Sequence, residues 1–165
     1  MTLYQSLIRA NRFDLVLEKG TEIGVSRFIP VAAARSIIQG NGEASPARSQ
    51  RWSRLVMEAA EQCGRGRLPR IDPPIALEDA VRGAQGLKLV PYEDERGLRL
   101  SVHLKALRER PRVVSLLIGP EGGFELSEIG LARENGWTSV SLGPRLMRSE
   151  TAGIVASALA VDALG

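Results

Sequence analysis

The chain has 165 residues, 22 of them basic and 19 acidic, which gives a net charge of +3. This length fits one domain that buries about 70% of the surface its unfolded form would expose. One cysteine excludes an internal disulfide, one histidine argues against a histidine-rich metal site, and no apolar run reaches membrane-spanning length. Because the N-terminus also lacks the layout of a secretion signal, we expect a cytoplasmic protein with no metal and no membrane partner.

Positive charge is concentrated in one segment. Residues 48–70 hold six arginines and two acids, a net charge of +4, so the rest of the chain sums to −1. Only three of the 22 basic residues are lysines, and guanidinium groups suit bidentate contacts to phosphate and stacking on bases. This composition is compatible with nucleic-acid binding, but a preference for arginine also follows from genome base composition.

The first predicted elements are a strand over Thr2–Ile8 and a helix after it. Asn11 is expected to cap this helix, with Asp14 at the reciprocal position, and Gly24 is a natural stop. The polar face carries three acids four residues apart, the last being Glu22. Because like charges at this spacing repel one another, we expect an arginine partner for Glu22.

A second strand is predicted over Arg27–Ala33, followed by a loop rich in Gly, Asn and Ser over Gln39–Pro46. From Ala47 the sequence predicts an amphipathic helix with Cys63 on its apolar side. We therefore expect Cys63 to face the core, where a thiol serves packing more often than reactivity.

The second half of the chain continues the alternation of strands and helices. The expected helices are Leu77–Arg82, Val102–Arg108, Leu126 to Asn135 and Ser149–Leu164. The expected strands are Leu87–Tyr92, Arg112–Ile118 and Thr138–Leu142. The second of these is almost wholly apolar, which is typical of strands buried on both faces of a parallel sheet. The pattern predicts an α/β domain with a mainly parallel sheet, whose ligands bind at the carboxyl edges of the strands.

Two sharp loops follow predicted strands, at residues 119–123 and 143–148. If these strands are adjacent in a parallel sheet, the loops lie side by side and form one pocket. Neither the dinucleotide fingerprint nor the P-loop pattern occurs, so the pocket is not expected to cradle phosphates. In the second loop two arginines flank two bulky apolar residues, an unusual composition for a solvated connection. From these residues alone, the interpretation that this second loop only covers the core is as well supported as the interpretation that it holds a ligand.

Five short motifs run in order along nearly the whole chain. They are Thr21–Val25, Arg35-Ser36, Glu58–Gln62 with Arg65, Ile118–Phe124 and Leu142–Ala152. Together they resemble the motif series of the ribosomal RNA small subunit methyltransferase E family. The chain departs from that series at Glu18, Gly20 and Glu125, and Glu125 replaces the usual Ser or Thr helix cap, which should weaken capping.

The resemblance implies a SPOUT-type domain with a deep trefoil knot at its C-terminal end. It also implies a homodimer that binds S-adenosylmethionine (SAM) in the knot and methylates N3 of a uridine in 16S ribosomal RNA. The partner is then this RNA or the small ribosomal subunit. Family members usually carry an N-terminal RNA-binding barrel domain, and we expect residues 1–165 to form the methyltransferase domain without it.

The resemblance also suggests site residues. Those expected to bind the cofactor are Tyr92, Ile118, Gly119, Pro120, Glu121, Gly122, Leu142, Gly143, Leu146, Met147 and Thr151. We expect Arg148 to stabilise the uracil anion, while Glu150 orients Arg148 or accepts the N3 proton. Alternatively, Arg148 and Glu150 form a structural pair that fixes the last helix. The residues expected to contact RNA, in a polar wall that a second subunit could complete, are Glu22, Arg35, Gln62, Arg65 and Arg145.

Three other functions remain open. A SPOUT methyltransferase could instead act on a tRNA guanine nitrogen or a ribose 2′-hydroxyl. A non-catalytic RNA-binding module could retain a degenerate cofactor pocket. A nucleotide-binding metabolic enzyme is disfavoured because no phosphate loop is recognisable.

Overall fold

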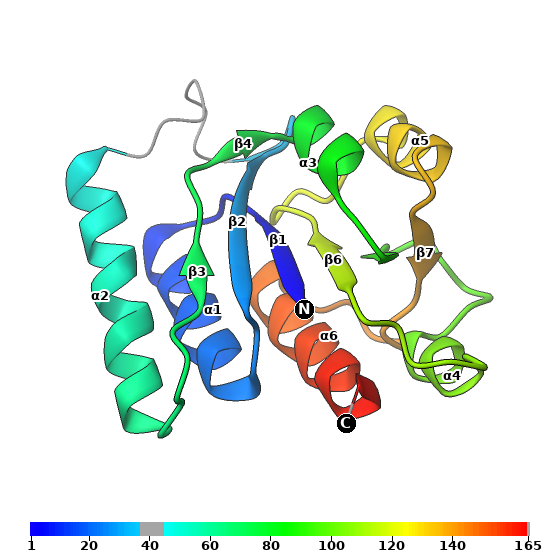
Figure 1. The fold of residues 1–165 in the computed structure, drawn as a ribbon. Coiled ribbons are helices and arrows are strands. Elements are labelled where there is room, and N and C mark those ends of the chain that lie inside the picture. Colours follow the sequence, from blue (N-terminus) through cyan, green and yellow to red (C-terminus); the bar gives the residue numbers. More distant parts are fainter. Residues whose placement is uncertain (37–44, 165) are drawn as a thin grey trace.

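The strands form one parallel sheet in a computed structural model that describes residues 1–36 and 45–164 (Figure 1). They are β1 (Thr2–Ser6), β2 (Arg27–Ala32), β3 (Arg70–Ile71), β4 (Ile75–Ala76), β5 (Leu87–Pro91), β6 (Val114–Ile118) and β7 (Thr138–Val140). The order across the sheet is β3-β2-β1-β6-β5-β7, and β4 also pairs with β2. Every pairing is parallel, which confirms the expected α/β architecture.

Helices cover both faces of the sheet. They are α1 (Ala10–Ile23), α2 (Pro46–Gln62), α3 (Leu77–Gly83), α4 (Leu100–Lys105), α5 (Leu126–Glu134) and α6 (Ser149–Leu164). Helices α3 and α5 lie on one face, while α1, α4 and α6 lie on the other with α2 outside α1 (Figure 1). In the described part of the chain no helix has the length and apolar character needed to cross a bilayer.

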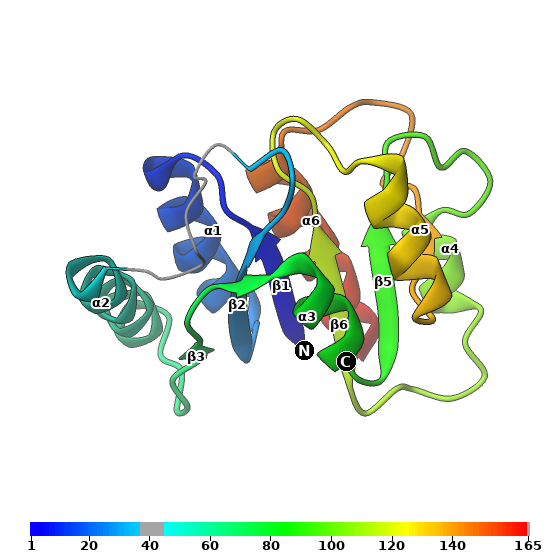
Figure 2. The same cartoon turned by 90° about the horizontal axis from the view of Figure 1, so that it is seen from above.

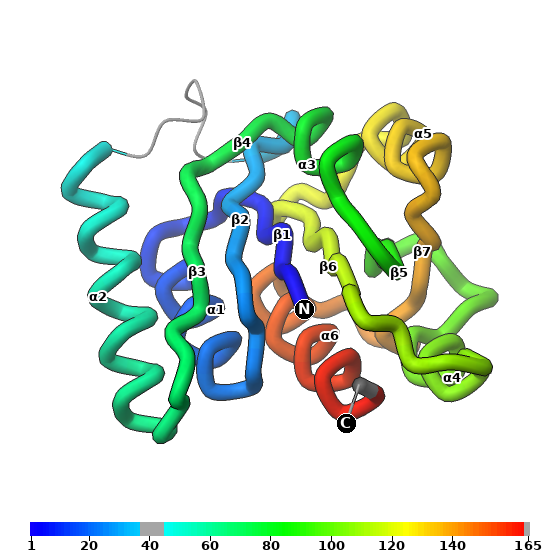
Figure 3. Tube along the Cα trace, viewed as in Figure 1, coloured from blue at the N-terminus to red at the C-terminus, as the bar shows by residue number. Residues whose placement is uncertain are grey.

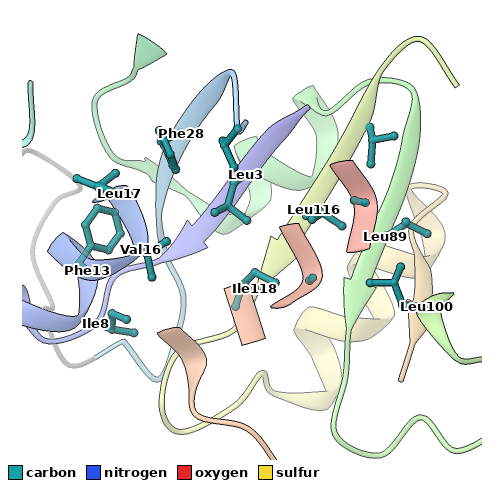
Figure 4. Close-up of a cluster of buried hydrophobic side chains, with 14 of the residues drawn as sticks. Leu3, Ile8, Phe13, Val16, Leu17, Phe28, Leu89, Leu100, Leu116 and Ile118 are labelled. Atoms are coloured by element: carbon teal, nitrogen blue, oxygen red, sulfur yellow. The ribbon is translucent and has the colours of Figure 1, made fainter. Parts of the chain in front are cut away.

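Alternate residues of the central strands enter two separate cores. Leu3 and Leu116 pack toward α1 and α6 together with Phe13 (Figure 4). Their neighbours Tyr4 and Leu117 belong to the cluster beneath α3 and α5. Burial on both faces explains why the sequence of β6 is almost continuously apolar, as expected for a parallel sheet.

The order of the last strands differs from the expectation. Leu89 of β5 is in register with Leu116 of β6 on one side and with Thr138 of β7 on the other. Thus β5 separates β6 from β7, and the predicted adjacency of the strands before the two sharp loops is wrong. The loops still meet, because the chain after β7 runs back past the end of β5 toward the start of α6 (Figure 3).

Two expectations about capping and burial are wrong because helix boundaries differ. Helix α1 begins at Ala10, and its N-cap is Arg9, which makes no side-chain capping bond. Asn11 therefore lies inside the first turn instead of capping it. Helix α2 ends at Gln62, so Cys63 follows the last regular turn and is exposed.

The acidic face of α1 is neutralised differently from the expectation. Glu22 accepts a hydrogen bond from Lys19 at 2.8 Å, so its partner is a lysine and not an arginine. The expected type of pairing occurs about two turns earlier on α1, where Arg51 of α2 pairs with Asp14. Lys19 lies three residues before Glu22 on the same side of the helix, so Glu22 is neutralised by a local partner.

The starts of α2 and α5, unlike that of α1, carry side-chain hydrogen bonds to backbone amides. The side chain of Ser45 accepts the amide of Arg48 at α2, while most of the expected loop Gln39–Pro46 lies outside the described residues. At α5, Glu128 accepts the amide of Glu125 at 2.8 Å. Because Glu128 satisfies this amide, the loss of capping expected from Glu125 is offset.

Gly86, in the turn between α3 and β5, provides a test of the fold. Its φ is 74°, and an added Cβ would overlap the carbonyl oxygen of Val113, which accepts the amide of Leu87. We expect Gly86→Ala to lower the free energy of unfolding by roughly 2 to 4 kcal/mol through backbone strain and overlap.

The matched control is Gly130→Ala, since Gly130 lies within α5 and its added Cβ would meet nothing within 4 Å. This change should stabilise the protein by roughly 0.5 to 1 kcal/mol. Urea unfolding monitored by tryptophan fluorescence measures both. A Gly86→Ala protein with the wild-type midpoint would show that the turn is not as tight as described.

Candidate functional site

A pocket of about 680 Å³ lies at the carboxyl edge of the sheet. Its lining comes from three segments, near residues 91–96 after β5, 118–124 after β6 and 141–149 before α6, which lie together in Figure 2. Arg12 of α1 and Ala152 of α6 complete it. This edge is where parallel sheets bind ligands, and the volume is typical of small-molecule sites.

The segment 118–124 is held in place from two sides. The amide of Gly123 donates to the carbonyl of Pro120 at 3.0 Å, closing a turn. Arg35, in the turn that follows β2, donates to the carbonyl of Gly122 at 3.1 Å. The ring of Phe124 is buried under Gly119, where an added Cβ would meet it at 3.1 Å. These contacts fix the backbone groups that face the pocket.

The segment 141–149 bends at Gly143, whose φ is 128°. Just before the bend, the amide of Ser141 donates to Leu98 at 2.7 Å, and the amide of Leu100 donates to Ser141 at 2.9 Å. The bend predicted at Gly143 is therefore present. It turns the chain from the outer edge of the sheet back across the end of β5.

Ser149 joins this segment to the centre of the sheet. Its hydroxyl donates to the carbonyl of Gly119 and accepts from Nε2 of Gln5 at 2.9 Å. Gln5 lies on β1 and is only 1% exposed. Gln5 was not predicted as a site residue, although a glutamine inside a buried apolar strand requires a polar partner and is in itself a signal.

Arg12 lies between two carboxylates of the site. Its Nη1 is 3.7 Å from Oε1 of Glu121, and its Nε is 3.7 Å from Oε1 of Glu150. Glu150 is only 7% exposed and does not line the pocket itself. The expected pairing of Glu150 with Arg148 is thus replaced by pairing with Arg12, a residue that the sequence analysis did not select.

Three arginines line the pocket without a carboxylate partner in the described part of the chain. Arg145 and Arg148 belong to the segment before α6, and Arg96 belongs to the segment after β5. All three are exposed. Since no acid neutralises them within one described chain, they present positive charge to a ligand at the pocket.

The Tyr92 hydroxyl is hydrogen-bonded to a carboxylate in the segment after β5. It donates to Oδ2 of Asp94 at 3.0 Å. Burial and this bond to the Asp94 carboxylate raise the pKa of Tyr92 above its ordinary value of 10.0. The phenol therefore remains protonated at neutral pH and holds Asp94 at the pocket wall.

The structure brings together nearly all residues expected to bind a cofactor. Those lining the pocket are Tyr92, Ile118, Gly119, Pro120, Glu121, Gly122, Leu142, Gly143, Leu146 and Met147. Leu146 is 85% exposed and lies at the mouth of the pocket. Thr151 is exposed on α6 and does not line it. Segment 143–148 thus lines the pocket along its whole length.

The expected RNA-contacting wall is not formed within one chain. Arg145 and Arg35 lie at the carboxyl edge of the sheet, whereas Glu22, Gln62 and Arg65 lie at the opposite edge. The reason is that α1 and α2 run back from the carboxyl edge, so their last turns lie far from the pocket (Figure 1). Arg65 also donates at 2.8 Å to two backbone carbonyls near the end of α1.

Among residues 1–36 and 45–164, no three His, Cys, Asp or Glu side chains are grouped so that they could hold a metal ion. The charged groups of the pocket are thus distributed around its wall and not gathered into a ligand cage.

The RNA methyltransferase domain model matches residues 1–161. The chain belongs to this family. It is 32% identical over 155 residues to ribosomal RNA small subunit methyltransferase E from Bacillus subtilis, covering 91% of this chain and 60% of that protein. The protein of the same name from Synechocystis is 34% identical, with 96% and 52% covered. The resemblance inferred from the motifs is confirmed, and the chain spans about half to two thirds of the length of these relatives.

Solved structures of methyltransferases share the fold. Ribosomal RNA small subunit methyltransferase E from Neisseria gonorrhoeae, bound to S-adenosyl methionine, superposes with a TM-score of 0.83 at 31% identity, covering 95% of this chain and 63% of that one. A putative methyltransferase from Legionella pneumophila, in complex with the bound cofactor SAM, gives 0.87 at 32% identity, with 96% and 64% covered. Both of these similar proteins were therefore seen with the cofactor that the motifs suggested.

Proposed function

We propose that this chain binds SAM in the pocket at the carboxyl edge and transfers its methyl group to N3 of a uridine in 16S ribosomal RNA. One observation carries the proposal. The two most specific family motifs, 118–124 and 142–152, converge on one pocket in a chain whose relatives include ribosomal RNA methyltransferases, and one of these and one putative methyltransferase are solved with SAM.

The chemistry of the lining fits SAM. Ile118, Leu142 and Met147 offer apolar surface for an adenine ring. The backbone of 119–122 offers amides and carbonyls that can pair with a purine edge. Asp94, held by Tyr92, offers a carboxylate to ribose hydroxyls or an ammonium group. An adenosine joined to a charged amino acid therefore finds complementary groups on each side.

In this proposal the cofactor supplies a methyl group activated by a positive sulfonium, and the chain positions the acceptor. Uridine N3 must lose a proton, which leaves negative charge on the uracil ring. Arg148 lines the pocket, is exposed and has no partner in the described part of the chain, so its guanidinium can stabilise that charge. Glu150 does not line the pocket and its Oε2 is buried, so we assign it the role of orienting the start of α6 next to Arg148, while the N3 proton passes to solvent.

The proposed RNA contacts centre on the mouth of the pocket. Arg96, Arg145 and Arg148 come from two different segments and carry no neutralising acid in the described chain. Guanidinium groups bind phosphates bidentately and position nucleic acid without reading its sequence. We therefore assign Arg96 and Arg145 to the backbone that flanks the target uridine, and Arg148 to the uracil itself.

We further propose a homodimer and a C-terminal trefoil knot, as the family resemblance implies. Partly exposed apolar side chains on α6, among them Ile154 and Leu159, support burial against a second subunit. In a dimer, Glu22, Gln62 and Arg65 could complete a pocket of the other subunit. The return of segment 141–149 past the end of β5 supports the knot.

Methyl transfer from isotopically labelled SAM tests the proposal. The chain is incubated with unmodified small-subunit RNA and with small ribosomal subunits, because it spans only part of its relatives' length. Mass spectrometry of the digested nucleosides should find label in 3-methyluridine. Label in methylguanosine or a ribose methyl would assign another target, and SAM binding without transfer to any RNA would favour a non-catalytic RNA-binding module.

A further inference from the structure

Arg12 connects segment 118–124 with the start of α6 through one acidic side chain on each. It projects from the first turn of α1 and has its guanidinium 3.7 Å from Glu121, after β6, and 3.7 Å from Glu150, at the start of α6. We propose that Arg12 is a positioning residue that clamps these segments in the geometry that binds SAM. This inference rests on the proposed function, which supplies the ligand.

The two carboxylates need this cation because both are largely buried. The Glu121 side chain is 19% exposed and that of Glu150 is 10% exposed. A carboxylate with so little access to water requires a paired charge or hydrogen-bond donors. In the described part of the chain, Arg12 is the only cationic side chain paired with either of them, and the one other donor is the amide of Arg9, 3.3 Å from Glu121.

Removing Arg12 would therefore do more than delete two ion pairs. Two like charges would remain on opposite sides of the position that it occupied, with little solvent between them. Their repulsion would drive segment 118–124 away from the start of α6. Both segments line the pocket, so its shape would change even though neither acid itself was altered.

A second link between the same segments shows what Arg12 adds. The Ser149 hydroxyl already bonds to the carbonyl of Gly119, and Gln5 supports it from β1. That link is neutral and lies in the interior. The Arg12 clamp is charged and reaches the pocket wall itself, where Arg12 is a lining residue. Segment 118–124 and the start of α6 are thus linked at two points, and only the link through Arg12 depends on charge.

The contacts of Arg12 with the two carboxylates are also longer than strong ion pairs. Charge-assisted hydrogen bonds between guanidinium and carboxylate are usually about 2.7 to 2.9 Å long, whereas both distances here are 3.7 Å. One oxygen of each carboxylate, Oε2, has no hydrogen-bond partner in the described part of the chain. Ligand binding can therefore shorten these contacts, and we expect the segments to become more protected when SAM is bound.

Calorimetric titration of SAM into variants of the whole chain tests this role. Arg12→Met should weaken binding by roughly 5- to 100-fold, the usual range for coupling between sites. Arg12→Lys should give an intermediate affinity, because an ammonium keeps the charge but lacks the guanidinium fork. The control Arg82→Met removes one exposed arginine of α3, outside the pocket, and should bind like the wild type.

Charge rescue distinguishes positioning from general support of the fold. In a protein with Glu121→Gln and Glu150→Gln, the added Arg12→Met should change SAM affinity less than twofold, because no charges remain to repel. An equal loss in both backgrounds, or wild-type affinity in Arg12→Met and Arg12→Lys, would overturn the proposal.

Failure of the proposed function would give a different result, namely no SAM binding by the wild type. In that case, amide hydrogen exchange of the free protein still tests the clamp. Arg12→Met should speed exchange in residues 119–123 relative to Arg82→Met, and equal exchange would overturn the inference.

Discussion

Replacing Arg148 with alanine is expected to lower the rate of methyl transfer by roughly 100- to 1000-fold, the usual effect of losing a group that stabilises developing charge. Arg148 is exposed, lines the pocket and pairs with no acid in the described chain. Its loss should therefore leave the fold and the affinity for SAM unchanged. The effect should be confined to the step in which uracil becomes negatively charged.

Single-turnover rates at saturating RNA measure this effect without interference from RNA binding. The matched control is Arg145→Ala, three residues earlier in the same segment and also exposed. It should raise the RNA concentration needed for half-maximal rate while leaving the maximal rate near that of the wild type. Full methyl transfer by Arg148→Ala at saturating RNA would show that Arg148 is not catalytic.

The second large effect is expected at Gly143. With φ at 128°, this residue occupies a backbone region that side chains disfavour. An added Cβ would meet no atom closer than 3.6 Å, so Gly143→Ala acts through backbone strain and not through a clash. Strain of roughly 1 to 3 kcal/mol should force segment 141–148 to rearrange and weaken SAM binding about 5- to 150-fold.

Gly136→Ala is the control for strain alone. Gly136 has φ of 81°, open space around it and a position after α5 that does not line the pocket. Both variants should lose similar free energy of unfolding, but only Gly143→Ala should lose affinity for SAM in equilibrium dialysis. Equal affinities would mean that the bend at Gly143 does not shape the binding site.

Local patterns predicted much of the fold. The alternation of apolar strands with amphipathic helices was sufficient for the parallel architecture, because each element buries a face that its own sequence reveals. Strand order was not accessible in this way. The placement of β5 between β6 and β7 depends on how distant segments pair, and the sequences of these strands would suit either neighbour.

The candidate site likewise has features that local sequence patterns predicted and features that depend on distant contacts. The glycine-rich segment 118–124 and the bend at Gly143 were recognisable because unusual residues are concentrated in each. Arg12 and Gln5 were missed since their partners lie more than 100 residues away in sequence. Arg65 was recognised as part of a family motif, yet its observed contacts are with backbone near the end of α1.

A crystal structure of the chain grown with SAM would show whether the pocket at the carboxyl edge binds the cofactor. We expect density for one SAM molecule per chain between segments 118–124 and 141–149, with Arg12 closer to Glu121 and Glu150 than the present 3.7 Å. Density for SAM anywhere else, such as the smaller hollow beside Phe13 and Trp52, would contradict it.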